Sequence, residues 1–460
     1  MGSGSYYDVV LVGAGPAGVF AALELARNSP LSIALVDQGP DLPERLARQS
    51  ADGRPDPALI MQGFGGAGAF SDGKLTLSPE VGGHLPEILG RDMASRLIED
   101  VDRIWLEFGA PAELFGVNVD CVEELQARAV RSGLKLVELP LRHVGTDLAP
   151  QVLSAMRAAL ANRVDLLMNT AVEAIVAEKS GMHGVRLADG RKLTARYVLL
   201  APGRSGAAWL RGEAQRLGLT MDQNPVDLGV RVEVPAPVLS ELTDSLYEFK
   251  LLYWSRTFDN LVRTFCVCPY GEVVAERVDD VITVNGHSYA NRRTENTNFA
   301  LLVSSRFTEP FDDPIAYGLY IAKLANLLGN GVLVQRLMDL RQGRRTTAHR
   351  LEHSIVQPTL TSAAPGDLSY ALPYRHLRVL LEMLEAMDKL TPGVWEGHTL
   401  LYGVELKLFS QRLKLTAELE TEIPNLFACG DGAGVTRGLV QASASGLAAA
   451  RAILSRSAKA

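Results

Sequence analysis

The sequence lacks the cysteine pattern of a dithiol redox site. Its 460 residues include four cysteines, Cys121, Cys266, Cys268 and Cys429, and none of them forms a C-x-x-C pair. A C-x-C pair such as Cys266 and Cys268 cannot easily close a relaxed disulfide, and we expect these two to be core residues rather than nucleophiles. Transfer of electrons to a protein disulfide is therefore excluded. The same pattern indicates a reducing compartment, and we expect the cytoplasm.

Long apolar runs and an excess of positive charge are also missing. No stretch resembles a membrane span, because the longest apolar runs contain Gly, Pro or charged residues, and we recognise no secretory signal. The formal net charge of −7 argues against a surface that coats nucleic acid. We therefore expect a small-molecule substrate, no membrane span and no nucleic-acid partner. Nothing in the sequence indicates an oligomeric state.

Residues 8–37 carry the strongest pattern in the chain. A short apolar strand, Asp8–Val12, is followed by Gly13, Gly15 and Gly18 in the spacing G-x-G-x-x-G, and Pro16 stands in the first turn of a helix. A second strand ends at Asp37. Glycines in this arrangement allow a tight turn, close approach of a pyrophosphate and close packing of helix on strand, and the terminal acid suits a ribose. The pattern predicts a dinucleotide site; the alternative is a glycine-rich helix start in an ordinary α/β domain.

A second glycine-rich stretch, residues 61–84, reads MQGFGGAGAFSDGKLTLSPEVGGH. Glycine at this density costs backbone entropy, so we look for a reason such as left-handed turns or contact with a ligand. We interpret it as a loop around the cofactor, with Gly65 and Gly66 at the pyrophosphate and Ser71, Asp72 and Lys74 near ribityl or flavin atoms. A flexible surface loop is the alternative.

The later parts of the chain predict a return to the first domain. Residues 164–203 alternate as strands, the last of which ends at Ala201-Pro202-Gly203, and residues 425–455 read as strand, glycine turn and helix. Between them, residues 226–400 change in composition, with several strand-like segments and helical segments over 312–342 and 374–390. We therefore predict an α/β fold: a Rossmann-like FAD-binding domain with a parallel central sheet, plus an inserted α+β substrate domain.

The motifs G-A-G-P-A-G, A-P-G and A-C-G-D-G-A-G resemble the FAD-binding elements of glutathione-reductase-type flavoproteins. The chain also resembles a family of bacterial FAD-dependent dehydrogenases of largely unassigned substrate. The motifs that carry this resemblance are GFGGAGAFSDGK, RHVGTD, VDLGVRVEVP, RTFCVCPYGEVV, NTNFALLVS, LLYGVE and CGDGAGVTRGLVQASASG. The resemblance implies that Asp431 hydrogen-bonds the ribityl or pyrophosphate part of FAD and that Val172 lies on the adenine side. The expected FAD contacts are Gly13, Ala14, Gly15, Pro16, Ala17, Gly18, Asp37, Gly65, Gly66, Ser71, Asp72, Lys74, Val172, Ala201, Gly203, Gly430, Asp431, Arg437, Gly438 and Leu439.

The expected domain boundaries follow the same motifs. We assign residues 6–80, 141–222 and 401–460 to the FAD-binding domain, 81–140 to a helical insertion and 223–400 to the substrate domain. No second G-x-G-x-x-G follows a strand, so a dedicated NAD(P)H domain is not expected. Either NAD(P)H docks transiently as reductant, or both redox partners are substrates that visit one flavin face.

The expected activity is hydride transfer between flavin N5 and a small organic substrate. For a proton partner we select His143, Glu405 and Tyr402, which lie next to predicted cofactor-contacting segments. Glu405 and Lys407 share one strand face, so a solvated charged face is the alternative for that pair. Arg231 and Arg437 are candidates to orient an anionic substrate.

Several alternatives stay open at this stage. A flavin monooxygenase shares the N-terminal glycines and a late Gly-Asp, although no tryptophan lies in the W-x-W-x-I-P run of halogenases. A flavin-containing RNA-modification protein would need a broad basic surface, and the one short arginine cluster, residues 341–350, is thin support. That cluster is either a solvated turn or an anchor for an anionic substrate group.

Overall fold

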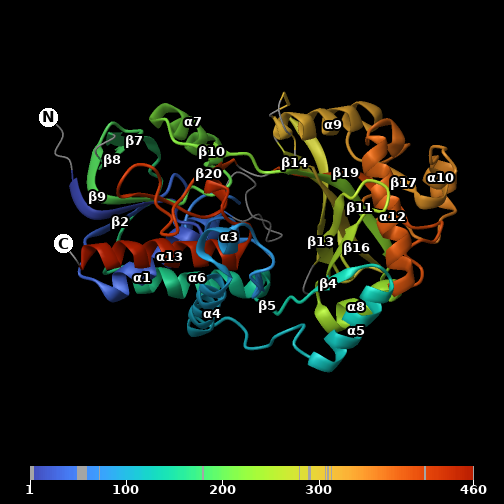
Figure 1. The fold of residues 1–460 in the computed structure, drawn as a ribbon, viewed down its shortest axis with the longest axis horizontal. Coiled ribbons are helices and arrows are strands. Elements are labelled where there is room, and N and C mark those ends of the chain that lie inside the picture. The colour runs from blue at the N-terminus through green and yellow to red at the C-terminus, as the bar shows by residue number, and fades with distance from the viewer. Residues whose placement is uncertain are drawn as a thin grey trace. The chain divides into compact units, whose positions relative to one another are not determined.

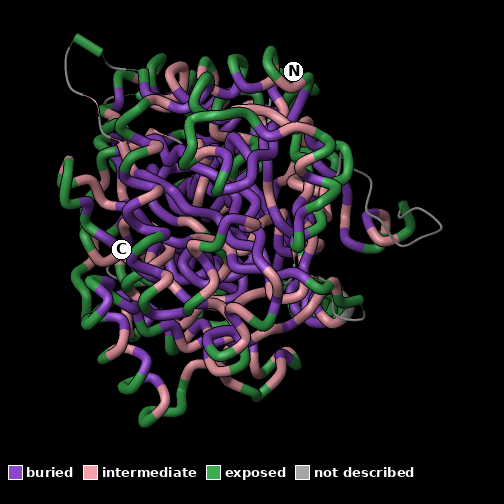
Figure 2. The backbone as a smooth tube through the Cα atoms, turned by 90° about the vertical axis from the view of Figure 1, so that its right-hand side faces the viewer, coloured by how far each residue is buried: buried purple, intermediate pink, exposed green. Residues whose placement is uncertain are grey.

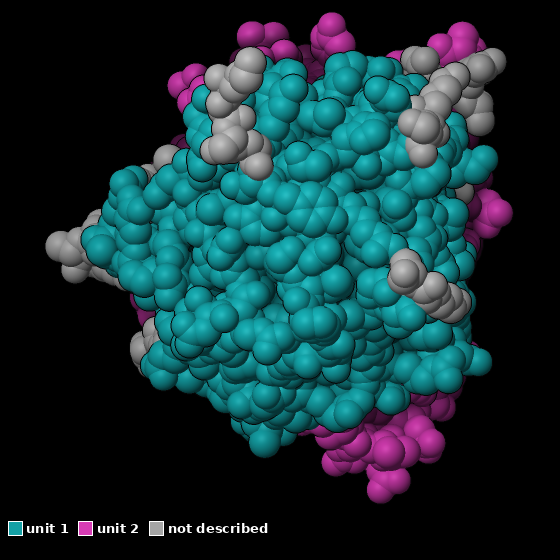
Figure 3. Space-filling view, turned by 90° about the vertical axis from the view of Figure 1, so that its left-hand side faces the viewer, with its two compact units in different colours: residues 1–113, 141–223, 410–460 teal, residues 114–140, 224–409 magenta. Residues whose placement is uncertain are grey.

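The chain divides into two units (Figure 3). Unit 1 comprises residues 1–113, 141–223 and 410–460, and unit 2 comprises residues 114–140 and 224–409. The computed structural model describes residues 5–48, 60–71, 73–178, 181–278, 280–288, 292–305, 307, 310–311, 313–408 and 411–458. In these residues no helix is both long and apolar enough to cross a membrane.

Unit 1 is built on a seven-stranded sheet with the order β6-β2-β1-β9-β8-β7, in which β21 also pairs with β9. β6, β2, β1, β9 and β21 run parallel, and β9, β8 and β7 form an antiparallel meander. β2 and the C-terminal halves of β1 and β9 are continuous apolar runs that are buried throughout, as a covered parallel sheet requires. The strands are β1 (Ser5–Val12), β2 (Ile33–Val36), β6 (Asp165–Leu167), β7 (Val172–Glu178), β8 (Gly181–Leu187), β9 (Lys192–Leu200) and β21 (Leu426–Ala428).

Helices α1 and α13 lie side by side against this sheet (Figure 1). They approach closely because small residues line the contact: a Cβ on Gly446 of α13 would overlap the main-chain oxygen of Ala17 in α1. The helices of unit 1 are α1 (Pro16–Asn28), α2 (Leu42–Ala47), α3 (Leu85–Leu89), α4 (Arg91–Glu107), α6 (Gly145–Leu160), α7 (Ala207–Leu217) and α13 (Leu439–Ser457). Its shorter elements are η2 (Gly66–Ala69), η4 (Asp431–Ala433), β3 (Lys74–Thr76), β5 (Leu141–His143), β10 (Met221–Asp222) and β20 (Arg412–Leu413).

Unit 2 is built on an eight-stranded sheet with the order β18-β17-β19-β11-β16-β13-β12-β4, antiparallel except for the β17–β18 pair. The hairpin β14–β15 pairs with itself. The strands are β4 (Lys135–Val137), β11 (Val226–Pro235), β12 (Lys250–Trp254), β13 (Leu261–Cys268), β14 (Glu272–Val278), β15 (Val281–His287), β16 (Asn296–Ser305), β17 (Leu333–Arg336), β18 (Ala364–Pro365) and β19 (Leu400–Lys407). The helices are α5 (Val119–Arg131), α8 (Ala236–Leu246), α9 (Pro314–Gly329), α10 (Leu337–Arg341), α11 (Ala348–Glu352), α12 (Tyr374–Leu390) and the short η3 (Leu368–Tyr370).

The central strand β11 separates an apolar from a polar face of this sheet. Its alternate residues Val226, Leu228, Val230, Val232 and Val234 belong to a core that includes side chains of α8, α9 and α12. The residues between them are polar or glycine and are buried as well, and Figure 2 shows how much of the interior of the chain is buried. Since successive side chains of a strand point to opposite faces, unit 2 carries a buried polar layer on the face of β11 away from α8, α9 and α12.

The expected fold class is confirmed: an α/β unit with a parallel central sheet and a second, α+β unit. Three details differ from expectation. The helix expected over 312–342 is interrupted by β17, an apolar strand of only four residues. The strand β19 pairs with β11 and β17, so the chain returns to unit 1 at residue 410 rather than at 401. The segment 81–140 is divided between the units at residue 114.

The contact between α1 and α13 gives a stability prediction. The substitution Gly446→Ala should destabilise the protein by about 1–3 kcal/mol, because the added methyl group forces two packed backbones apart. Gly212 in α7 is the matched control, since a Cβ there meets no atom within 4 Å. Gly212→Ala should be neutral or should stabilise by up to about 1 kcal/mol through helix propensity. Urea denaturation measures both; equal effects of the two substitutions would contradict the packing argument.

A buried histidine gives a pH dependence. His376 in α12 is 4% exposed, and burial, with a smaller effect of Arg375, lowers its pKa from the usual 6.5 to about 4. The folded state therefore binds fewer protons than the unfolded state, and the stabilisation present above pH 6.5 is lost as the pH falls toward 4. Between about pH 7 and pH 5 the loss should be about 2 kcal/mol. Denaturation midpoints should show this slope in wild type and in the control His183→Gln, an exposed position, but not in His376→Gln.

Candidate functional site

The turn after β1 is shaped by its glycines. Gly13 has φ +105°, its N–H donates to the main-chain oxygen of Val36 at 2.7 Å, and a Cβ there would overlap the main-chain oxygen of Ala201. A Cβ on Gly18 would in turn overlap the oxygen of Gly13. The strand ends of β1 and β9 and the start of α1 thus meet at backbone contact distance, which only glycine permits.

The second glycine-rich loop closes onto this turn. The N–H of Gly65 donates to the oxygen of Ala14 at 2.8 Å, and a Cβ on Gly66 would lie 2.9 Å from Cα of Gly15. Arg45 of α2 is 1% exposed and donates to the carbonyl oxygens of Ile60, Phe64 and Gly66. Burial lowers the pKa of Arg45 to about 10. A buried cation therefore fixes the loop from behind.

The C-terminal glycine turn joins the same place. The N–H of Gly430 donates to Oγ of Ser445 at 3.0 Å, and a Cβ on Gly432 would overlap the oxygen of Gly203. Asp431 accepts a hydrogen bond from Thr436 Oγ1 at 2.9 Å, and burial raises the pKa of its carboxyl. The expected convergence of segments 13–18, 65–66, 201–203 and 430–439 is thus present in unit 1.

Two helix N-termini meet at this loop. A Cβ on Gly68 would lie 3.5 Å from Cγ of Pro16, the first residue of α1, and 3.1 Å from Cδ2 of Leu439, the first residue of α13. The N-terminus of a helix presents free N–H groups and a partial positive charge. Together with the buried Arg45, these two ends form an electropositive cradle suited to an anion such as a diphosphate.

Three glycines of the cradle have free space before them. A Cβ on Gly15, Gly203 or Gly438 would meet no atom within 4 Å, although each lies in a segment that is otherwise tightly packed. Gly15 has φ −75°, which any residue can adopt, so the backbone conformation there does not require glycine. Such space is what a nucleotide that approaches the backbone would need.

Asp37 accepts three hydrogen bonds from backbone N–H groups. Its Oδ2 accepts from the N–H of Ala14, and its Oδ1 accepts from the N–H groups of Gly39 and Gly63, each at 2.8 Å. The carboxylate therefore ties the turn after β1 to the glycine-rich loop. The expected bond to a ribose would use the remaining acceptor capacity of the same carboxylate.

The other expected residues lie at varying places in unit 1. Lys74 and His143 are opposite each other in the β3–β5 pair, and Ser71 Oγ accepts from the N–H of Gly73 at 3.2 Å. Val172 begins β7, two residues after Thr170, whose N–H donates to the oxygen of Asp37 at 2.8 Å. The N–H of Arg437 donates to the oxygen of Gly82 at 2.7 Å. Asp72 lies outside the described residues.

In unit 2, the polar layer centres on Arg231, which is fully buried. Its Nε donates to Asn298 Oδ1 at 2.7 Å, and its Nη2 donates to the carbonyl oxygen of Cys266 at 2.6 Å and contacts Cys268 Sγ at 3.2 Å. A Cβ on Gly286 of β15 would overlap the guanidinium group, so the hairpin β14–β15 covers it at backbone distance. The two cysteines differ, because Cys266 has φ +45° beside a register shift and only Cys268 is buried.

Glu405 lies in the same layer and is fully buried. Its Oε1 is 3.5 Å from Nη1 of Arg231 and 3.0 Å from Nζ of Lys407. Burial acts to lower the pKa of Lys407, but Glu405 and Glu276 hold it above its usual value. The alternative of a solvated charged face is therefore wrong for this pair. Within the described residues, Oε2 of Glu405 and Nδ2 of Asn298 have no hydrogen-bond partner, which leaves one acceptor and one donor available in this layer.

Tyr402 is fully buried and already has a partner. Its hydroxyl donates to Oε2 of Glu233, whose other oxygen accepts from Thr359 Oγ1 at 2.6 Å and from Asn296 Nδ2 at 3.1 Å. Burial raises the pKa of Glu233, and burial with the nearby Glu233 raises the pKa of Tyr402 well above 10. At neutral pH the Tyr402 hydroxyl therefore stays protonated and donates a hydrogen bond to Glu233.

Comparison with known proteins adds a family description. A family model described as "FAD-dependent protein, C-terminal domain-like" matches residues 226–407. An uncharacterized protein of Clostridium beijerinckii is 28% identical over 475 residues, which cover 97% of this chain and 80% of that protein. Among solved structures, glycine oxidase from Geobacillus kaustophilus (TM-score 0.37, 16% identity) is matched over 98% of this chain and 95% of its own. The E. coli quinol fumarate reductase (TM-score 0.42, 13% identity) is matched over 98% of this chain and 70% of its own.

Several residues of these sites were not anticipated from the sequence. Arg45 is a single arginine in a short helix, and Ser445 lies in a run of small residues; neither carries a signal. Glu233 and Asn298 could have been found from strict alternation. Glu233 lies two residues from Arg231 on the same face of β11, and Asn298 lies opposite Glu233 on the paired strand β16. The alternation indicates a polar face, but not that this face is buried.

The buried ion group gives a stability prediction. Glu405→Gln should destabilise the protein by about 3–5 kcal/mol, because it leaves Arg231 and Lys407 buried without their carboxylate. Glu276→Gln is the control: Glu276 is exposed and lies 4.0 Å from the same Lys407, so its loss should cost at most about 1 kcal/mol. Chemical denaturation compares the two; a cost for Glu405→Gln no larger than that of the control would show that Glu405 is not a buried counter-charge.

Proposed function

We propose that unit 1 binds FAD and that the protein is an FAD-dependent oxidoreductase acting on a small organic substrate with an anionic group. The observation that carries the proposal is the electropositive cradle, in which two helix N-termini meet a glycine-rich loop beside glycines with free space before them. The diphosphate that joins the two halves of a dinucleotide is the anion that best suits such a cradle. The description of the family model that matches residues 226–407 supports the same cofactor.

The residues that would hold the cofactor are those of the cradle. The N–H groups at the starts of α1 and α13 would bind the pyrophosphate, and Asp37, already oriented by three backbone N–H groups, would accept from the adenosine ribose. We expect Asp431 to hydrogen-bond the ribityl chain. When bound, FAD supplies a centre that accepts or returns a hydride at N5.

For the proton partner we favour Glu405 over Tyr402 and His143. Glu405 is a carboxylate whose Oε2 no described residue engages, whereas the Tyr402 hydroxyl is bound to Glu233. Arg231, held by Asn298 and Cys266, keeps the first carboxylate oxygen in place. We propose that Glu405 holds a substrate proton at Oε2 and that the neighbouring cations Arg231 and Lys407 attract an anionic substrate group. NAD(P)H as a transient reductant belongs to the same proposal.

Gly15→Val separates cofactor binding from folding. The valine side chain would enter free space, so the melting temperature of the FAD-free protein should stay unchanged while FAD affinity falls by about 100-fold or more, because the Cγ atoms occupy the path of the pyrophosphate. Gly212→Val is the control, with equal space before it and no role in the cradle. Flavin absorbance and equilibrium dialysis measure the affinity. FAD affinity that is the same in both variants would remove the cradle as the FAD site.

The reaction class is tested by anaerobic reduction of the holoenzyme. Bleaching of the flavin band by NADH, NADPH or one of a panel of small acids and alcohols should identify the reductant. Oxygen uptake driven by NADPH with a hydroxylated product would instead indicate a monooxygenase. A protein that neither carries nor takes up FAD would contradict the proposal as a whole.

A further inference from the structure

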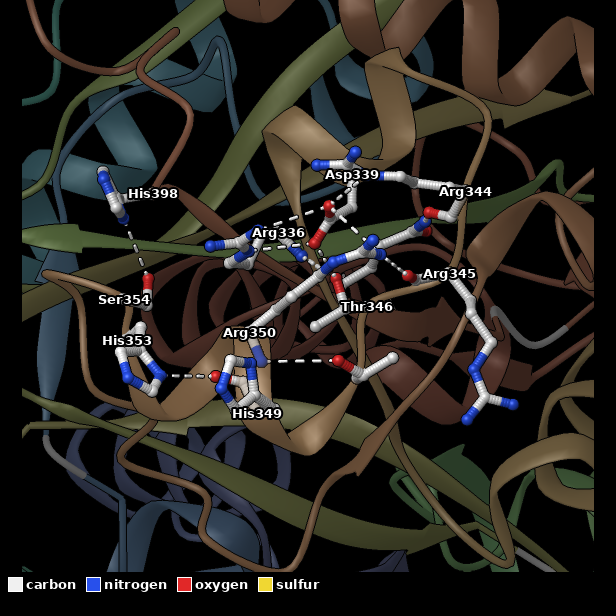
Figure 4. Close-up of polar contacts among 12 residues, drawn as sticks. Arg336, Asp339, Arg344, Arg345, Thr346, His349, Arg350, His353, Ser354 and His398 are labelled. Atoms are coloured by element: carbon white, nitrogen blue, oxygen red, sulfur yellow. Dashed lines mark hydrogen bonds and ion pairs between the residues drawn. The ribbon is translucent and has the colours of Figure 1, made fainter.

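The arginine cluster of unit 2 surrounds one buried carboxylate (Figure 4). Asp339 of α10 is fully buried; its Oδ2 lies 2.9 Å from Nε of Arg336, and its Oδ1 lies 2.7 Å from Nε of Arg344 and 3.7 Å from Nη1 of Arg350. Thr346 Oγ1 donates to Oδ2 at 2.8 Å. Although burial acts to raise the pKa of Asp339, the hydrogen bonds from Arg336, Arg344 and Thr346 hold it at about 2, so the carboxylate is charged.

The charges in this cluster do not balance. Three guanidinium groups face a single carboxylate, and among the described residues no second acid forms an ion pair with any of the three. Arg336 and Thr346 already bind Asp339 from the buried side. The side chain of Arg336 is only 11% exposed. Arg344 and Arg350, whose side chains are 42% and 35% exposed, bring two further positive charges to the surface. One guanidinium group would be enough to neutralise Asp339, so the charges of Arg344 and Arg350 exceed what this turn needs.

The outer arginines are held in place with donors to spare. Arg344 uses Nε for Asp339, and Arg350 uses Nη1 for the main-chain oxygen of Arg345 at 2.9 Å. The remaining N–H groups of both have no hydrogen-bond partner among the described residues. The backbone between them is fixed by bonds from Arg344 N to the oxygen of Asp339 and from Gln335 Nε2 to the oxygen of Arg344. Anchored guanidinium forks with free donors bind phosphate oxygens in pairs.

We propose that Arg344 and Arg350 form a binding site for a phosphate group, with Asp339 as the buried counter-charge that orients them. The two surplus positive charges match a phosphate dianion better than a single carboxylate. Arg345, whose side chain points away from Asp339 in Figure 4, and the exposed His349 border the site. The group could arrive as free phosphate or pyrophosphate, on a phosphorylated substrate, or as the 2′-phosphate of NADPH. The site lies wholly in unit 2 and does not rest on FAD binding.

Titration calorimetry of the full chain with inorganic pyrophosphate at low ionic strength, in the presence of excess FAD to occupy the cradle of unit 1, tests the site. Wild type should bind with a Kd below about 1 mM, and Arg344→Gln with Arg350→Gln should weaken binding by about tenfold or more per arginine. The matched control is Arg341→Gln with Arg375→Gln, which removes the same charge; these arginines lie over the rings of Trp395 and Phe258 and do not pair with Asp339. The control should leave the Kd within about twofold.

A second measurement needs no variant. Pyrophosphate should protect Arg344 and Arg350 of the wild-type protein from phenylglyoxal, as mapped by mass spectrometry, and should not protect Arg341. Displacement of pyrophosphate by NADPH but not by NADH would assign the site to a 2′-phosphate, whereas displacement by neither would assign it to inorganic phosphate or a phosphorylated substrate. Absence of pyrophosphate binding up to about 10 mM, equal weakening in the two double variants, or equal modification of Arg344 and Arg350 with and without pyrophosphate would overturn the proposal.

Discussion

The structure of unit 1 depends on direct contact between backbones that are far apart in the sequence. Gly13 lies against Ala201, Gly432 against Gly203 and Gly446 against Ala17, each so closely that a Cβ would overlap main-chain atoms. Side chains would hold these segments several ångströms further apart. The contacts place the ends of β1 and β9, the starts of α1 and α13 and the turn before α13 around one point, and a site for an anion follows from that geometry because helix N-termini carry unpaired N–H groups.

The electrostatics of this cradle are arranged in two layers. Nearest the free space lie the partial positive charges of α1 and α13, which are fixed by the backbone and need no reorganisation. Behind them, Arg45 ties the glycine-rich loop to α2 through carbonyl groups of the loop. Asp37 ties the same loop to the turn after β1 through N–H groups of Ala14 and Gly63. A full charge is thus used to hold the backbone, while the backbone presents its own dipoles toward the space. With a pKa of about 10, Arg45 stays charged at neutral pH although it is buried. Its charge is used by the loop carbonyl groups that it holds, and this keeps the loop rigid.

The sequence allowed the fold class and the cradle to be predicted because both depend on local rules. Glycine spacing, an apolar strand and the following helix identify residues 8–37 without tertiary information. The failures involve tertiary context. β17 has four residues between two helices, too few for a period to emerge, and β19 looks like any buried strand until its partners β11 and β17 are known. Glu405 and Lys407 alternate like a solvated edge, and only the hairpin β14–β15 that covers the sheet turns this polar face into an interior.

The buried polar layer of unit 2 is hard to explain by stability. On β11 the opposite face shows that this sheet can be filled with Val and Leu, and replacing a buried ion group by apolar residues of similar volume is often neutral or stabilising. Here the layer instead contains Arg231, Glu405 and Lys407 with one carboxylate oxygen and one amide nitrogen unsatisfied among the described residues. Each unsatisfied buried group costs about 1–3 kcal/mol. A bound polar molecule, water or substrate, that forms hydrogen bonds with Glu405 Oε2 and Asn298 Nδ2 would offset that cost. The energetics of the layer therefore argue for a ligand there.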